Sequence, residues 1–151
     1  MIPELQSFAE QPLGRMLTVM GRGYLHLLRE RLKHLDIDRN YYALILIGSR
    51  DGLITQQELA FQLETDKVSI VRVVDYLSEK GYVKRIRKPD DKRKRSLLLT
   101  EKARQALPEI RRSISEINVQ VLKGIDKPAI TGFGDTIEKI KKNITENIHT
   151  S

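Results

Sequence analysis

Apolar residues recur at helical intervals along the first third of the chain. Between residues 12 and 35 they return every three, four or seven positions, at Leu13, Leu17, Met20, Tyr24, Leu27 or Leu28, Leu32 and Leu35. This is the period of one face of a long amphipathic helix, which the polar residues 36–38 should end. Residues 39–49 are apolar on nearly every side, so a second helix there is expected to be central and buried.

Two shorter helices are predicted next. Thr55 is followed three residues later by Glu58, which is the spacing of a capping box at a helix start. A further helix should cover residues 66–80, with Asp66 as its N-cap and Gly81 as the left-handed residue that ends it.

The chain then changes from helical to extended character. Residues 82–88 begin with a β-prone stretch, residues 89–91 form a turn signal, and residues 96–99 are β-prone again. Two short strands around a turn predict a β-hairpin.

Two more amphipathic helices complete the chain. Thr100 should cap the first, residues 124–126 should end it, and Pro108 inside it can introduce a kink. Its apolar positions are Ala103, Leu107, Ile110, Ile114, Ile117 and Val121, and those of the last helix are Ile130, Phe133, Ile137, Ile140, Ile144 and Ile148. The second set is spaced close to a heptad seam. The predicted order is therefore ααααββαα, a mainly α fold with a small β-hairpin.

Positive charge is concentrated in the predicted hairpin. Residues 84–95 hold eight Lys or Arg against two Asp, a net charge of +6 in a chain whose total is +7. Like charges packed together repel one another, and the usual compensation is a polyanionic partner, most often nucleic acid. A solvated basic loop without a partner is the alternative that charge alone leaves open.

The amino-acid composition limits which partners and which activities we expect for this chain. Aromatic residues make up 5% of the chain, which disfavours single-stranded binding by base stacking and favours duplex. Cysteine is absent, so disulfides, thiolate metal sites and thiol redox sensing are excluded. The sequence contains no phosphate-binding loop and no nucleophile–base motif. The three histidines, His26, His34 and His149, do not have the spacing of metal ligands. We therefore expect no cofactor, no metal site and no enzymatic activity. We find no signal peptide and no apolar stretch of ~20 residues, and therefore expect a cytoplasmic protein with no membrane partner.

Two short helices followed by a basic hairpin are typical of a winged helix-turn-helix, whose second helix enters the DNA major groove. One side of the predicted helix 66–80 should face the core through Ile70, Val73, Val74 and Leu77. The opposite side and its flanks carry the candidate DNA contacts Thr65, Val68, Ser69 and Arg72, and Lys67, between the two faces, is a candidate phosphate contact. Arg72 can bind guanine through two hydrogen bonds, Ser69 can bond a base or a phosphate, and Val68 can touch a thymine methyl group. An ordinary surface helix with an exposed arginine is the alternative.

Two acidic residues on the outward side of this helix would repel phosphate. Asp75 and Glu79 are expected to form ion pairs, for example Asp75 with Arg72 or with Arg85. Alternatively, they limit how far the helix enters the groove.

The hairpin tip supplies a second set of candidate DNA contacts. Asp91 precedes Arg93 by two residues, so its carboxylate can hold the guanidinium across the turn. An arginine fixed in this way can enter a narrow minor groove. The candidates for phosphate contact are Lys92, Lys94 and Arg95, and Lys88 is included among the DNA-binding residues.

These segments resemble the MarR family of bacterial transcription regulators. The resemblance rests on QELA at residues 57–60, LSEKGYVKR at 77–85, PDDKR at 89–93 and LLLT at 97–100, where the family pattern is roughly QxLA, LxxKGxVxR, PxDxR and LxLT. The flanking helices also have the expected order, although Glu101-Lys102 stands where many members have a glycine. The resemblance implies an obligate homodimer, formed by the first and the last two helices, whose wings reach the minor groove.

The resemblance also implies a response to a small effector, usually anionic and aromatic, bound between the dimer region and the DNA-binding lobe. The candidate effector residues are Met16, Met20, Tyr24, Tyr41 and Tyr42. Plain core packing is the alternative for each of them. The absence of cysteine excludes the thiol-oxidation sensors of the family.

The apolar stripes outside the winged helix must be buried by something. They can fold back within one chain or pair across a two-fold axis, and pairing would also set DNA half-sites about one helical turn apart. The candidate dimerisation residues are Leu13, Leu17, Leu107, Ile110, Ile114, Ile117, Val121, Ile137, Ile140 and Ile144. We therefore expect one structural domain, with a DNA-binding lobe at residues 37–100 between dimerisation segments at 1–36 and 101–151.

The predicted function is a homodimeric, sequence-specific regulator that binds double-stranded DNA, a ligand-responsive repressor on a palindromic operator. The competing class is an architectural binder of nucleic acid, DNA or RNA, without sequence choice. A third class is a protein-interaction winged helix that has lost DNA binding, against which Arg72 and residues 91–93 argue.

Overall fold

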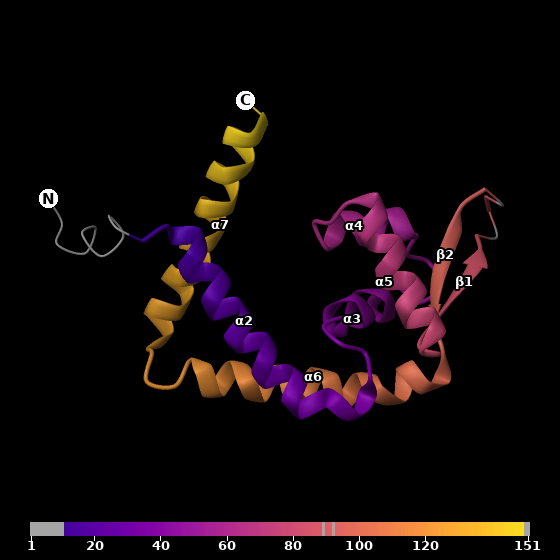
Figure 1. The fold of residues 1–151 in the computed structure, drawn as a ribbon, viewed down its shortest axis with the longest axis horizontal. Coiled ribbons are helices and arrows are strands. Elements are labelled where there is room, and N and C mark those ends of the chain that lie inside the picture. The colour runs from indigo at the N-terminus through magenta and orange to yellow at the C-terminus, as the bar shows by residue number, and fades with distance from the viewer. Residues whose placement is uncertain (1–10, 89, 92, 150–151) are drawn as a thin grey trace, which may run out of the picture. The chain divides into compact units, whose positions relative to one another are not determined.

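The computed structural model describes residues 11–149 except residues 89 and 92. In chain order it contains α2 (Leu13–Leu32), the 3-10 helix η1 (Lys33–Leu35), α3 (Tyr41–Ser49), α4 (Gln56–Gln62), α5 (Lys67–Glu79), β1 (Val83–Arg87), β2 (Arg95–Leu99), α6 (Glu101–Val121) and α7 (Lys127–His149) (Figure 1). The predicted order ααααββαα is confirmed. The chain divides into two compact units, residues 1–115 and 116–151, and each is described by itself.

Two helix boundaries differ from the prediction. The first long helix is α-helical only to Leu32, and residues 33–35 continue it as a tighter 3-10 turn. Helix α3 begins at Tyr41, two residues later than predicted. The reason is that Asp36 and Asp38 adopt left-handed φ angles of 54° and 50°, which a right-handed helix does not accommodate. Pro108 lies inside α6, which continues past it as one helix.

Helix α3 lies at the centre of the core of the first unit. Leu44 and Ile47 are fully buried, as expected, whereas Tyr42 is exposed, so one side of the helix is uncovered. The other fully buried side chains include Leu32, Leu59, Leu77, Leu97, Leu99 and Ile110. Because these come from α2, α4, α5, β2 and α6, helix α5 and the hairpin share one core with α3.

The predicted capping box starts helix α4. The main-chain N–H of Glu58 donates to Thr55 Oγ1 over 3.1 Å, and the main-chain N–H of Thr55 donates to Glu58 Oε2 over 2.7 Å. Both bonds satisfy N–H groups that a helix start would otherwise leave without a partner. The first helix of the helix-turn-helix therefore begins at a position that the local sequence dictates.

Removing the Thr55 hydroxyl should lower the free energy of unfolding. Because Thr55→Ala deprives the Glu58 N–H of its acceptor in a half-buried setting, we expect a loss of ~0.5–2 kcal/mol, measured by urea denaturation. Thr55→Ser keeps the acceptor and should stay close to wild type. Equal destabilisation by both substitutions would show that the methyl group, not the cap, matters at this position.

The hairpin is anchored at its base by a segment that the sequence did not predict. Strands β1 and β2 pair antiparallel, starting from the pair Val83 and Leu99. The N–H of Gly52 donates to Leu97 O over 2.9 Å, and the N–H of Leu97 donates to Ile54 O over 2.8 Å. The α3–α4 connection thus adds backbone hydrogen bonds to β2 and holds the wing beside the two short helices.

Helix α7 forms most of the second unit and leaves its apolar side uncovered. None of its described side chains is buried. The helix has 23 residues, and its apolar positions are Ile130, Phe133, Ile137, Ile140, Ile144 and Ile148, the last of them 67% exposed. An apolar stripe of this length requires a further surface against which to pack.

Candidate nucleic-acid interface

The first turn of α5 is fixed by Asp66, as predicted. Its carboxylate Oδ1 accepts the main-chain N–H groups of Val68 (2.9 Å) and Ser69 (2.8 Å), and Ser69 Oγ donates to Oδ2 over 2.8 Å. The hydroxyl proton of Ser69 is thereby held by the cap, so this predicted DNA contact keeps only its lone pairs for a further partner. The same contacts hold the pKa of Asp66 below its ordinary value, chiefly through the N–H of Ser69 and then through its hydroxyl.

This lowered pKa has a consequence for stability at acid pH. A carboxyl group whose pKa is lower in the folded state stabilises the fold above its unfolded pKa, and the contribution disappears as the pH falls through the folded value. Wild type should therefore be more stable than Asp66→Ala at pH 5–7, and its advantage should shrink below about pH 4. Urea titrations of both proteins from pH 7 to pH 3 measure this difference, with Asp135→Ala on α7 as the control. A constant advantage across that range would contradict a capping role for the carboxylate.

The two faces of α5 are those that periodicity predicted. Ile70, Val74 and Leu77 are buried, and Val73 is half-buried. On the outward side, Val68 is 64% exposed. The other outward candidates are Thr65, which is half-buried, and Lys67 and Arg72, which are exposed. The N-terminal half of α5 is therefore free to meet a groove.

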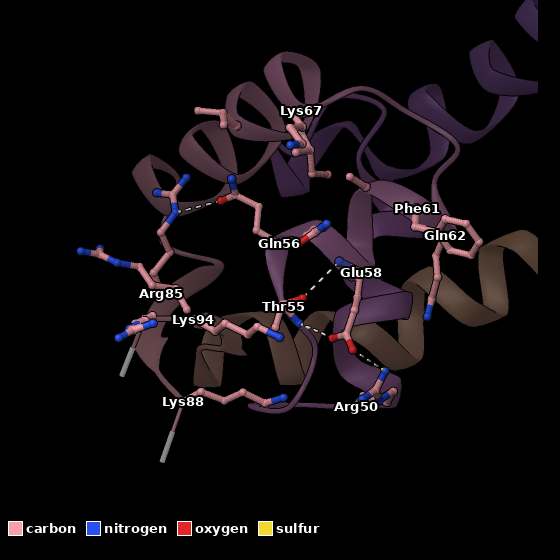
Figure 2. Close-up of a pocket in the computed structure, with 16 residues that line it drawn as sticks. Arg50, Thr55, Gln56, Glu58, Phe61, Gln62, Lys67, Arg85, Lys88 and Lys94 are labelled. Carbon is pink, nitrogen blue, oxygen red and sulfur yellow. Dashed lines mark hydrogen bonds and ion pairs between the residues drawn. The ribbon is translucent and has the colours of Figure 1, made fainter. Parts of the chain in front are cut away.

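A clamp around Arg85 joins the wing to both helices of the helix-turn-helix. Arg85 Nη2 lies 2.6 Å from Asp75 Oδ1 on α5. Arg85 Nε donates to Gln56 Oε1 on α4 over 3.2 Å (Figure 2). Of the two partners expected for Asp75, the structure selects Arg85. This pairing neutralises the carboxylate nearest to Arg72 and leaves the Arg72 guanidinium without an ion pair among the described residues. Gln56 was missed because nothing local distinguishes it.

At the hairpin tip, Asp91 bonds main-chain N–H groups of the residues that follow it. Asp91 Oδ1 accepts the main-chain N–H of Arg93 over 3.0 Å, and Asp91 O accepts the N–H of Lys94 over 3.0 Å. The prediction that Asp91 holds the Arg93 guanidinium is wrong in the described structure, because two residues of separation suit the Asx turn to the backbone. Lys92 lies outside the described residues. Arg93 and Lys94 are exposed.

Helices α4 and α5 and the two flanks of the wing enclose a basic groove of about 940 Å³ (Figure 2). It gathers five of the predicted DNA contacts: Lys67, Lys88, Arg93, Lys94 and Arg95. The groove also contains Arg50 and Phe61, which the sequence reasoning missed; Phe61 is 83% exposed. The carboxylate of Glu58 is engaged by the Thr55 N–H and by Arg50 Nη1 at 3.7 Å, so it does not offset the excess of cations. Thr65, Val68, Ser69, Arg72 and Asp91 are not part of the groove lining.

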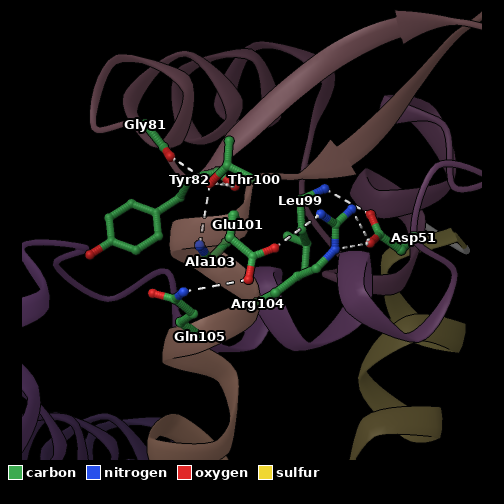
Figure 3. Close-up of polar contacts among 9 residues, drawn as sticks. All are labelled: Asp51, Gly81, Tyr82, Leu99, Thr100, Glu101, Ala103, Arg104 and Gln105. Carbon is green, nitrogen blue, oxygen red and sulfur yellow. Dashed lines mark hydrogen bonds and ion pairs between the residues drawn. The ribbon is translucent and has the colours of Figure 1, made fainter.

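A second polar cluster fixes the return of the wing into α6 (Figure 3). Asp51 Oδ1 accepts the N–H of Leu99 over 2.7 Å, and Asp51 Oδ2 accepts Arg104 Nε and Nη2 over 3.0 and 2.8 Å. The hydroxyl of Thr100 donates to Gly81 O over 2.6 Å and accepts the N–H of Ala103 over 3.3 Å, so the predicted cap is confirmed. These contacts set the direction in which the hairpin leaves the lobe.

The candidate effector residues differ in how far they are buried. Among the effector candidates, Tyr41 is a core residue at 2% exposure, Met20 and Tyr42 are exposed, and Met16 and Tyr24 are half-buried. Tyr41 also lines a cavity of about 300 Å³ with Asp36, Tyr76 and others.

Some of the dimerisation candidates already belong to the core of the chain. Ile110 and Ile117 are buried within the chain and so cannot offer a surface to a partner, as the prediction supposed. The others are half-buried or exposed: Leu13, Leu17, Leu107, Ile114, Val121, Ile137, Ile140 and Ile144. In the described part of the chain no helix is long and apolar enough to cross a membrane, and no three potential metal ligands gather.

The comparisons with known proteins concern both the sequence and the fold. A model of the MarR family matches residues 37–94. A protein assigned to that family from Listeria monocytogenes, solved with a 26mer DNA, superposes with a TM-score of 0.80 at 25% identity over 91% of each chain. Mutant MarR from E. coli in complex with operator DNA gives 0.78 at 26% identity over 88% of this chain and 96% of that one. The PcaV regulator from Streptomyces coelicolor, in complex with its natural ligand, gives 0.78 at 20% identity over 89% and 94%.

Proposed function

We propose, from the premise that this chain belongs to the MarR family of winged helix-turn-helix transcription regulators, that it acts as a homodimeric repressor on a palindromic operator. The observation that carries the proposal is the basic groove beside the outward face of α5. Groove and helix together offer the charge that duplex DNA requires and the side chains that can read its bases.

The charge of the groove supports binding to the DNA backbone. Lys67, Lys88, Arg93, Lys94 and Arg95 line one continuous concavity, and each lysine or arginine that contacts a phosphate adds affinity through counterion release. The wing tip beyond the groove would then reach the adjacent minor groove. The complexes of related proteins with a 26mer and with operator DNA support duplex DNA as the partner.

Sequence choice is assigned to α5. Arg72 is exposed and has no ion pair among the described residues, because Asp75 is taken by Arg85. A free guanidinium on the outward face of a recognition helix can form two hydrogen bonds to guanine. Val68 offers an exposed apolar contact for a thymine methyl group in the preceding turn.

Dimerisation is proposed for the apolar stripe of α7. The stripe runs along a helix none of whose described residues is buried, and a second copy of the same helix can bury it across a two-fold axis. Two copies would also present two recognition helices to a palindrome. The parts of α2 that remain exposed, such as Leu13 and Met20, fit the same role.

Repression would follow from occupation of promoter DNA in the cytoplasm, and release from binding of an effector. The complex of PcaV with its natural ligand supports a ligand-responsive role.

Selection of bound sites from random duplex DNA tests the proposal. A two-fold symmetric consensus with half-sites about one helical turn apart is expected. Uniform recovery of all sequences would contradict it and favour the architectural class, which the basic groove alone could also serve. A preference for single strands or RNA in a parallel selection would likewise contradict it.

A further inference from the structure

Three arginines and a histidine gather where α2 bends into α3. Arg22, His26 and Arg29 stand four and three residues apart on α2 and so share one face, and Arg39 comes from the connection that precedes α3. Together with Leu25 they line a cavity of about 190 Å³. We call Arg22, His26, Arg29 and Arg39 the arginine elbow.

The arginine elbow is not neutralised by the protein. Among the described residues, none of its three guanidinium groups forms an ion pair. The nearby acidic side chains are otherwise engaged or set apart: Glu30 pairs with Lys33 at 3.5 Å, and Asp36 pairs with Lys80 at 2.7 Å. Asp38 does not line this cavity; it lines the neighbouring one, which Arg29 also reaches, and forms no ion pair with that arginine in the described structure. Cations held together without counter-charge repel one another, so the elbow is favourable for an anion.

The lining also indicates what kind of anion fits. Its guanidinium groups are planar forks that match carboxylate and phosphate oxygens in pairs. The lining contains no Phe, Tyr or Trp side chain, and its one aliphatic member is Leu25. A volume of 190 Å³ corresponds to roughly six water molecules at ~30 Å³ each. A small ligand with several oxyanion groups satisfies this set better than a large aromatic one.

The location argues against a phosphate of the operator. Arg29 also lines the neighbouring cavity together with Tyr76, which lies near the C-terminal end of α5, whereas the N-terminal turns of α5 are the ones proposed to meet DNA. A helix of 13 residues spans about 20 Å, so the two ends serve different surfaces.

We propose that the arginine elbow is an effector site for a compact anion with two or more negative charges, a phosphorylated or polycarboxylated metabolite. The expected effect on DNA binding rests on the proposed function, whereas the binding of the anion to the elbow does not. None of the effector candidates Met16, Met20, Tyr24, Tyr41 and Tyr42 lines this cavity.

The elbow is connected to the recognition helix. The hydroxyl of Tyr76 donates to Asp36 O over 3.1 Å, Lys80 pairs with the Asp36 carboxylate, and the hydroxyl of Tyr82 donates to Leu35 O. Asp36 stands in the left-handed region at φ 54°, an uncommon conformation for a non-glycine residue. An anion that draws Arg39 towards α2 therefore acts on a connection that holds the last turn of α5.

Calorimetric titration of the full chain with pyrophosphate and with citrate, at fixed ionic strength, tests the site. At least one of the two should bind with one site per chain, and Arg29→Gln should weaken that binding tenfold or more. Arg111→Gln on α6 and Arg93→Gln on the wing each remove one positive charge elsewhere and should leave it unchanged. Absence of saturable binding, or loss through Arg93→Gln and not through Arg29→Gln, would overturn the proposal. Arg22→Gln serves as a second variant if Arg29→Gln does not melt cooperatively.

Operator binding tests the regulatory part. The anion should weaken the affinity of wild type for the selected operator about fivefold or more, and Arg29→Gln should bind the operator normally but not respond. An equal response in both proteins would mean competition at the DNA surface and would refute the elbow as effector site. If neither protein binds any operator, the proposed function fails, while the calorimetry still decides the anion site.

Discussion

Replacing Ile137 and Ile140 together by aspartate should convert the protein to a monomer and remove high-affinity operator binding. Both residues lie on the apolar stripe of α7, three positions apart, and are only half-buried in the chain. In a dimer they would be buried against the partner, where an unpaired carboxylate is strongly disfavoured. In a monomer both positions keep access to solvent, so the aspartates cost less there and the equilibrium shifts to the single chain.

Loss of the dimer should have a large effect on DNA binding, because a monomer reaches only one half-site. Specific complexes dissociate at about 10⁻⁸–10⁻¹¹ M and non-specific ones at about 10⁻⁴–10⁻⁶ M, so we expect operator affinity to fall by ~100-fold or more. Sedimentation at micromolar concentration should give twice the 17.4 kDa chain mass for wild type and the chain mass for the variant.

The control for this experiment lies on the same helix. Lys139→Asp also adds a negative charge to α7, at an exposed polar position, and should leave both mass and affinity close to wild type. Circular dichroism establishes whether the double variant keeps its helices. A folded double variant that remains dimeric would refute α7 as the dimer surface.

Replacing Arg72 by alanine should relax the base preference at one position of each half-site. The guanidinium can make two hydrogen bonds to guanine, and their loss costs ~1–3 kcal/mol against the preferred base. Competition assays with operators changed at single positions measure this preference. Because Asp75 is paired with Arg85, removal of Arg72 should leave the clamp and the stability of the fold intact.

Lys94→Ala is the matched comparison, because Lys94 is an exposed cation of the basic groove. A phosphate contact carries no sequence information, so its loss should weaken binding to all duplexes alike and reduce the slope of log affinity against log salt by about 0.9. The two variants should thus differ in which DNA sequences they affect, as well as in the size of the effect on affinity. Equal effects of both on every sequence would refute the division between base reading by α5 and phosphate binding by the groove.

The elements of the DNA-binding lobe and the starts of α4 and α5 could be predicted because their signals are local. Thr55 and Glu58 are three residues apart, and Asp66 bonds N–H groups two and three residues ahead. Likewise, the buried and exposed faces of α5 follow from the 3.6-residue period alone. The wing was predictable for the same reason, since its two strands are adjacent in the chain.

The sequence left alternatives open, or favoured the wrong one, where a side chain had more than one possible partner. Asp91 could bond the guanidinium or the main chain of Arg93, and the turn favours the main chain. Asp75 could pair with Arg72 on its own helix or with Arg85 on the strand, and the packing of β1 beside α5 favours Arg85. Ile110 and Ile117 have the spacing of a dimer face but are already buried in the chain.

The sequence by itself determined the order of elements, the caps of the two short helices, the facing of α5 and the concentration of charge in the wing. Only the tertiary structure decided which distant residues meet: Asp51 with Arg104 across 53 positions, Gly52 with Leu97, and the arginines of α2 with Arg39. The physical reason is that caps and periodicities act within one or two turns of the backbone. Contacts between elements depend instead on how a shared core orients them, and no local pattern encodes that orientation.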